Sequence, residues 1–85
     1  MLWDVIWSDK AAKQLDSLGK DIARRIRDGV LDIRENPYRA TKRLKSSKFF
    51  SLRVGDYRVI LDLRRGQMTI FVVSTSGRGR SYDRL

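Results

Sequence analysis

Apolar and polar positions follow two different periods along the chain, and these periods predict its strands and helices. Residues 2–7 form a short apolar run that contains both tryptophans, which is typical of a strand. In such a strand Trp3 and Trp7 share one face, while Leu2 and Ile6 share the other. Apolar residues on both faces predict a central place in the sheet. They also favour core packing of the tryptophans over the alternative of a platform on which bases stack.

Two amphipathic helices are predicted after this strand. Ser8 can cap the first helix, and Gly19 can end it in a left-handed conformation. The apolar face of this helix consists of Ala11, Ala12, Leu15 and Leu18. The second helix is expected over residues 20–35, because Asn36-Pro37 would stop it. Its buried stripe consists of Ile22, Ile26, Gly29, Val30 and Ile33. A glycine inside a helix costs about 1 kcal/mol relative to alanine, so Gly29 indicates close packing at that point.

Three further strands are expected over residues 49–54, 57–63 and 68–75. Gly55-Asp56 and Arg65-Gly66 are the turns between them, so consecutive hairpins give an antiparallel meander. The connection before these strands, residues 39–48, is polar and basic, and it could be a functional loop or a loose strand. The predicted fold class is α+β, with the order β-α-α-β-β-β and a helical hairpin packed on the sheet. One domain over residues 1–85 is expected.

The turn at Gly55-Asp56 predicts which side chains face each other across the first hairpin. With two residues in the loop, Val54 lies opposite Tyr57 and Arg53 lies opposite Arg58. Like charges in direct opposition destabilise a sheet, and an anion between them removes that cost. The alternate positions of both strands are apolar and predict the core face. Arg53 and Arg58 are therefore expected on the open face.

The same count through Arg65-Gly66 pairs Arg58 with Val73, so residues 76–82 should leave the sheet beside the arginine pair. Four arginines and a tyrosine would then converge at one edge: Arg53, Arg58, Arg78, Arg80 and Tyr82. The alternative is that Arg78 and Arg80 lie in a frayed basic tail and that Tyr82 only packs.

The charge of the chain is concentrated in its second half. Residues 1–38 hold seven basic and seven acidic side chains, whereas residues 39–85 hold twelve basic and three acidic ones, which accounts for the net charge of +9. Such a basic module is first interpreted as a nucleic-acid binder, and a solvated basic surface that aids solubility is the alternative. The basic residues before the meander join the predicted RNA-binding set: Lys42, Arg43, Lys45 and Lys48.

The missing residue types limit the chemistry. The chain has no histidine and no cysteine, which excludes the commonest general base, zinc sites built from these residues, and disulfides. It has no apolar run long enough to cross a bilayer and none of the features of a signal peptide, so we expect a cytoplasmic protein with no membrane partner.

RNA carries its own nucleophile, the 2′-hydroxyl group, and a cluster of arginines suits its cleavage. The rigid fork of arginine binds phosphate oxygens in pairs and can stabilise the charge that develops on phosphorus. Neighbouring cations favour the phenolate form of Tyr82, which would make it a general base. Arg58 could stabilise the leaving oxygen.

The strings Leu52-Arg53-Val54-Gly55-Asp56-Tyr57-Arg58-Val59-Ile60 and Ile70-Phe71-Val72-Val73-Ser74, with a Gly-Arg-rich segment that ends in Tyr82, resemble the RelE/ParE superfamily of toxins. The helix break at Leu18-Gly19 and the helix end at Asn36-Pro37 resemble this family too. The resemblance implies a toxin of a type II toxin–antitoxin pair. In its RelE branch, the toxin enters the ribosomal A site and cleaves mRNA without a metal or other cofactor.

On this resemblance Arg58 matches the strand arginine of the RelE active site. Arg78 matches the arginine that stabilises the transition state, with Arg80 as a possible substitute, and Tyr82 matches the C-terminal tyrosine, at a shorter spacing. The two lysines that RelE carries before this block fall on Phe49 and Ser51, and Lys45 and Lys48 could serve instead.

Two other functions fit the same sequence. One is a ParE-like inhibitor that binds DNA gyrase and cuts no RNA, and the other is a non-catalytic RNA- or ribosome-binding module. The expected partners are the ribosome, mRNA and a cognate RelB-like antitoxin. This antitoxin would lay an acidic or amphipathic helix across the basic concavity or displace part of the tail.

Overall fold

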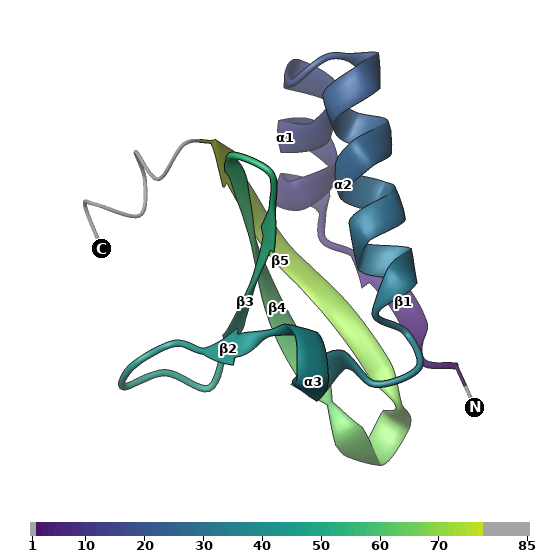
Figure 1. Ribbon diagram of the computed structural model, residues 1–85, viewed down its shortest axis with the longest axis vertical. Helices are drawn as coiled ribbons and strands as arrows, with labels where there is room; N and C mark the ends of the chain where they lie inside the picture. Colours follow the sequence, from purple (N-terminus) through teal and green to yellow (C-terminus); the bar gives the residue numbers. More distant parts are fainter. Residues whose placement is uncertain (1, 78–85) are drawn as a thin grey trace.

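The fold is a five-stranded sheet in the order β1-β5-β4-β3-β2, with two helices packed on one of its faces (Figure 1). This computed structural model describes residues 2–77. The elements in chain order are β1 (Asp4–Trp7), α1 (Asp9–Ser17), α2 (Lys20–Asp32), α3 (Pro37–Ala40), β2 (Lys42–Arg43), β3 (Phe50–Val54), β4 (Tyr57–Arg64), a 3-10 turn η1 (Arg65–Gln67) and β5 (Thr69–Gly77). The predicted α+β class and the antiparallel meander β3-β4-β5 are confirmed.

The predicted central position of β1 is wrong. β1 lies at an edge of the sheet and pairs in parallel with β5, because the helical hairpin carries the chain across the sheet before the meander begins. The helices pack on one face of the sheet only, so the side chains of Leu2, just before β1, and Ile6 are 58% and 49% exposed. Core packing of the tryptophans is confirmed, because Trp3 belongs to the buried core and Trp7 packs against it.

The helices begin and end for local reasons. Ser8 caps α1 by accepting a hydrogen bond from the Ala11 amide at 3.0 Å. Gly19 has the expected positive φ of 89°, but its ψ of 160° is extended, and it serves as the N-cap of α2. Of the predicted apolar face of α1, Ala11 and Leu15 are buried, whereas Ala12 is exposed.

The second helix is shorter than predicted, and a further helix follows it. α2 ends at Asp32, and Pro37 then begins the one-turn helix α3, where its fixed φ suits the first helical position. Gly29 marks a close approach as predicted, although the neighbour is a strand. A Cβ atom on Gly29 would lie 2.9 Å from Cγ2 of Val54 in β3.

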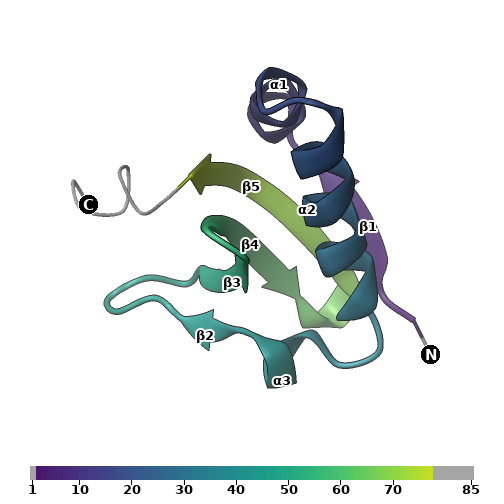
Figure 2. The same ribbon diagram turned by 45° about the horizontal axis from the view of Figure 1, so that its top comes forward.

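The core lies between α1, α2 and the sheet face that alternation predicts. Its fully buried side chains include Ile26 and Val30 from α2, and Val59, Leu61, Ile70 and Val72 from the strands. Figure 2 shows α1 and α2 together on one side of the strands, while the loop between β2 and β3 projects away from them. None of the helices in residues 2–77 combines the length and the apolar character that a membrane crossing needs.

The register of the first hairpin is confirmed and that of the second is corrected. Val54 pairs with Tyr57 and Arg53 with Arg58, as the two-residue turn predicts. Arg58 pairs with Ser76 instead of Val73. The turn is longer than predicted, because Arg64 pairs with Thr69 across η1. A bulge at Val73 of β5, opposite Ile60 and Leu61, shifts the register again.

Candidate functional site

The open face of the meander carries the predicted arginine pair at one end of β4. Arg53 in β3 and Arg58 in β4 lie directly opposite each other. Arg53 is exposed and donates a hydrogen bond from Nε to the carbonyl oxygen of Gly55 at 3.2 Å, which holds its guanidinium near the turn. Arg58 is half-buried. Two guanidinium groups in this arrangement offer paired donors to a phosphate.

The end of β5 completes this part of the sheet. Ser76 pairs with Arg58, and Gly77, the last described residue, pairs with Tyr57 beside the turn. In the observed register, Ser76 lies opposite Arg58, in the same row as Arg53. The end of β5 therefore lies closer to the arginine pair than the predicted pairing of Arg58 with Val73 would place it. The predicted site residues Arg78, Arg80 and Tyr82 lie outside the described residues.

The predicted RNA-binding residues of the connection divide between a short strand and a loop. Lys42 pairs with Ser51 and therefore belongs to the open face, whereas Arg43 pairs with Phe50, a position of the core face. Arg43 donates from Nε to the carbonyl oxygen of Ser47 at 3.0 Å, within the loop that joins β2 to β3. The register thus brings Lys42 to the face of Arg53 and Arg58 and does not bring Arg43 there.

Lys45 and Lys48 lie in this projecting loop, where Ser46 has a positive φ of 59°. The loop surrounds a shallow hollow of about 500 Å³ that is lined by residues 43–48. Lys48 Nζ lies 5.6 Å from the centre of the Phe49 ring, a cation–π contact. Lys45 and Lys48 therefore belong to a loop that projects away from the helices, as the course of the backbone in Figures 1 and 2 shows.

The two positions that carry lysines in RelE differ in their surroundings. Ser51 is 9% exposed and is flanked in the sheet by Lys42 and Ile60, so its hydroxyl group has little access to a bound ligand. Phe49 is half-buried beneath Lys48. Lys42 and Lys48 are thus the cations that directly adjoin these two positions.

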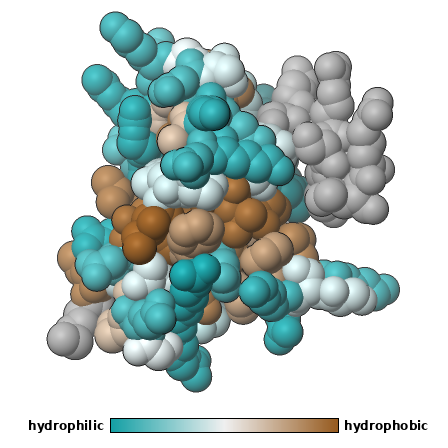
Figure 3. Space-filling view, turned by 180° about the vertical axis from the view of Figure 1, so that it is seen from behind, coloured by the Kyte–Doolittle hydropathy of each residue, from teal (hydrophilic) through white to brown (hydrophobic). Residues whose placement is uncertain are grey.

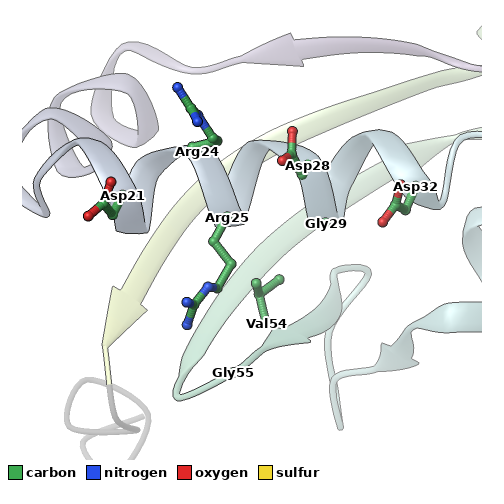
Figure 4. A pocket seen from close by; sticks show the side chains of 8 residues that line it. All are labelled: Asp21, Arg24, Arg25, Asp28, Gly29, Asp32, Val54 and Gly55. Atoms are coloured by element: carbon green, nitrogen blue, oxygen red, sulfur yellow. The ribbon is translucent and has the colours of Figure 1, made fainter.

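A second hollow, which the sequence did not predict, lies on the helix side of the molecule. It has a volume of about 670 Å³ and lies between α2 and the turn of the β3–β4 hairpin (Figure 4). Its lining consists of Asp21, Arg24, Arg25, Asp28, Gly29, Asp32, Val54 and Gly55. Arg25 extends toward the hairpin turn, while Arg24 points away from it (Figure 4). The spacing of Asp21, Arg25, Asp28 and Asp32 along one side of the helix is the signal that could have found it.

The comparisons with known proteins agree with this architecture. The family model "ParE toxin of type II toxin–antitoxin system, parDE" matches residues 5–82. The chain belongs to the ParE toxin family, within the RelE/ParE superfamily. It is accordingly a toxin of a type II toxin–antitoxin system. No curated protein matches the sequence.

Solved structures that resemble this ParE-family chain include RelE toxins, free or with an antitoxin. The toxin–antitoxin complex RelBE2 from Mycobacterium tuberculosis gives a TM-score of 0.83 at 22% identity, over 92% of this chain and 93% of that chain. A variant of the Escherichia coli toxin RelE in the free state gives 0.80 at 20% identity, over 98% and 90%. The archaeal RelE–RelB complex from Pyrococcus horikoshii gives 0.79 at 25% identity, over 94% and 99%.

Proposed function

We propose that this toxin is an endonuclease that cleaves mRNA in the A site of the ribosome. The observation that carries the proposal is the row formed by Arg53, Arg58 and Ser76 on the open face. It sets two opposed arginines beside the end of the described chain, and Arg78, Arg80 and Tyr82 follow within five residues of Gly77 in the sequence. A row of this kind suits the phosphodiester backbone better than it suits a neutral ligand.

The proposed chemistry uses the nucleophile of the substrate itself. The 2′-oxygen attacks the neighbouring phosphorus and forms a new P–O bond, while its proton passes to the Tyr82 oxygen, the general base. Arg78, with Arg80 as its possible substitute, stabilises the negative charge of the phosphorane. The P–O5′ bond then breaks, which leaves a 2′,3′-cyclic phosphate, and Arg58 stabilises the leaving 5′-oxygen until it takes a proton from water. Arg53 and Lys42 bind the RNA backbone on the open face, and Arg43, Lys45 and Lys48 bind it at the loop between β2 and β3.

The ribosome supplies what this small site lacks. A chain of 85 residues with a net charge of +9 has enough positive charge to associate with ribosomal and messenger RNA, but it offers few groups to bend and orient a substrate. Positioning of the reacting atoms by a larger partner can lower the barrier by several kcal/mol, about 7–11 in the best cases. Ribosome dependence is therefore part of the proposal.

A cognate antitoxin is the second proposed partner. Several of the similar solved structures are complexes of RelE with RelB. Seen from behind, this molecule exposes a band of hydrophobic surface between two hydrophilic zones (Figure 3). An amphipathic antitoxin segment with acidic residues would cover such a band and meet the neighbouring cations.

Primer extension on an mRNA translated in vitro tests the enzymatic proposal. With the purified toxin, cuts within codons are expected on ribosome-bound message and none on the same message without ribosomes. Arg78→Ala and Tyr82→Phe variants should lose the cuts and still bind ribosomes. Equal cutting of free and ribosome-bound message would contradict ribosome dependence.

A gyrase inhibitor is the second candidate function, and a specific observation favours it. The matching family model is that of ParE, and the lysine positions of RelE are occupied by Phe49 and the nearly buried Ser51. If no mRNA is cut, a DNA supercoiling assay with purified gyrase decides between this function and a non-catalytic RNA-binding module. Inhibition of supercoiling supports the first, and its absence supports the second.

A further inference from the structure

β5 is flanked differently along its two halves. Its first half pairs with β1, from Asp4 opposite Thr69 to Trp7 opposite Val72. The Ser8 amide then donates to the carbonyl oxygen of Val72 at 3.0 Å, and the chain turns into α1. Beyond Val72, α1 takes the place of β1 beside β5.

Two side chains of this region bind the β5 backbone where β1 no longer reaches it. The Ser8 hydroxyl donates to the carbonyl oxygen of Val73 at 2.8 Å while it also caps α1. Six residues further along the chain, in α1, Oε1 of Gln14 accepts a hydrogen bond from the Thr75 amide at 2.7 Å. These two bonds alternate along β5 as strand hydrogen bonds do, so α1 substitutes for a strand through its side chains.

The bond to Gln14 lies in a buried place. Thr75 is 3% exposed and pairs with the fully buried Val59, and its hydroxyl oxygen is buried without a hydrogen-bond partner among the described residues. Water therefore has little access to the Thr75 amide, and the Gln14 side chain is its partner. The next residue along β5, Ser76, stands opposite Arg58.

We propose that Gln14 is a positioning residue for the toxin's active site. By holding the Thr75 amide, it fixes the last residues of β5 against β4, and thereby the position of Ser76 opposite Arg58. The proposed role rests on the endonuclease function, because it concerns the alignment of Ser76 with Arg58 in the row on the open face. Gln14 itself touches no substrate.

The physical consequence of losing this acceptor is a displaced strand end. A buried amide without a partner is costly, so the end of β5 would move until water reaches Thr75. The bulge opposite Ile60 and Leu61 separates the last four residue pairs of the β4–β5 ladder from the rest, so this end of β5 can shift without moving the first half of the strand. A displacement of about 1 Å between catalytic groups can reduce a rate by about 100-fold.

A set of three variants tests the proposal. Gln14→Met keeps the length of the side chain and removes the acceptor, Gln14→Glu keeps an acceptor, and Ala12→Met places a methionine at an exposed position of the same helix. For ribosome-dependent cleavage, we expect kcat of Gln14→Met to fall by about 10- to 100-fold with KM unchanged. Gln14→Glu should restore kcat to within about threefold of the wild type, and Ala12→Met should match the wild type.

Amide hydrogen exchange supplies a measurement that does not depend on the reaction. In Gln14→Met, the Thr75 and Ser76 amides should exchange at least about tenfold faster, whereas those of Ile70 and Val72 beside β1 stay slow. Unchanged exchange at Thr75 overturns the proposal. So does faster exchange with an unchanged kcat, because the bond would then be structural only. If the wild type cleaves no mRNA, the endonuclease proposal fails by itself, and the exchange measurement alone then decides whether Gln14 holds the end of β5.

Discussion

The two hairpins of the meander keep their register by different means. The β3–β4 hairpin closes through the two-residue turn Gly55-Asp56, where Gly55 has a φ of 60°, and its ladder runs without interruption. The β4–β5 hairpin closes through the 3-10 turn η1, carries a bulge, and is tied from outside by Ser8 and Gln14. A tight turn specifies register locally, whereas a loose turn leaves the register to contacts with distant residues.

β4 is shared by both hairpins, and the largest expected effect on activity comes from Arg58 at its start. Arg58→Ala removes a guanidinium group from the row in which the hairpins meet, and we expect cleavage of ribosome-bound mRNA to fall by 100-fold or more, about 2.7 kcal/mol. Arg64→Ala is the matched control at the other end of the same strand, where Arg64 contacts Asp62 at 3.1 Å and lies over the Phe71 ring. Equal loss of cleavage in both variants would mean that charge, and not position, matters.

The outside ties of the second hairpin give the next largest effect. Ser8→Ala removes both the cap of α1 and the donor to Val73, so the free energy of unfolding should fall by about 1–2 kcal/mol in urea denaturation. Ser17→Ala is the control, since the Ser17 hydroxyl only donates to the Gln14 carbonyl oxygen on the exposed side of the same helix. A Ser8 variant as stable as this control would show that the ladder to β4 alone holds β5.

The two turns themselves can be compared by one substitution. Gly55→Ala forces an L-residue into a positive φ, which should cost about 1 kcal/mol of unfolding free energy. Gly66→Ala meets no atom within 4 Å and requires no positive φ, so it should leave stability unchanged or raise it by about 0.5 kcal/mol through the unfolded state. Thermal unfolding of both variants checks the difference, and equal melting temperatures would refute the local origin of the first register.

The smallest effect is expected at Thr75, which lies in β5 between β4 and α1. Thr75→Val keeps the shape of the side chain and removes a buried hydroxyl oxygen without a hydrogen-bond partner among residues 2–77. Stability should stay constant or rise by up to about 1 kcal/mol. A clear loss in calorimetric unfolding would show that the hydroxyl group has a partner in solution.

The accuracy of the sequence predictions follows the same division. The pairing of Arg53 with Arg58 was predictable because the turn residues lie next to the strands that they connect. The bulge opposite Ile60 and Leu61 was not, since Val73 and Ser74 continue an ordinary strand pattern and only the structure shows their offset. The predicted central position of β1 was wrong. Apolar residues on both faces normally indicate a buried strand, yet Leu2 and Ile6 are exposed.

The candidate site shows a comparable limit. Alternation along β3 and β4 predicted the open face and its arginines, and the structure agrees. Gln14 gave no signal, because a polar residue on an amphipathic helix is normally solvated, and its partner Thr75 lies 61 residues away. Pro37 was interpreted as the end of a helix, and the same residue also begins α3, an ambiguity that local sequence cannot resolve.

The two outer strands of the sheet have a consequence for how copies of this chain can meet. β2 is only two residues long and both are cations, which repel a second strand, whereas β1 has apolar neighbours at its edge. Association through backbone pairing is therefore favoured at the β1 edge, beyond Trp3, whose amide and carbonyl groups already bind Arg34. Two copies joined β1 to β1 would close a symmetric pair with charged margins on both sides, and growth into a fibre would stop there.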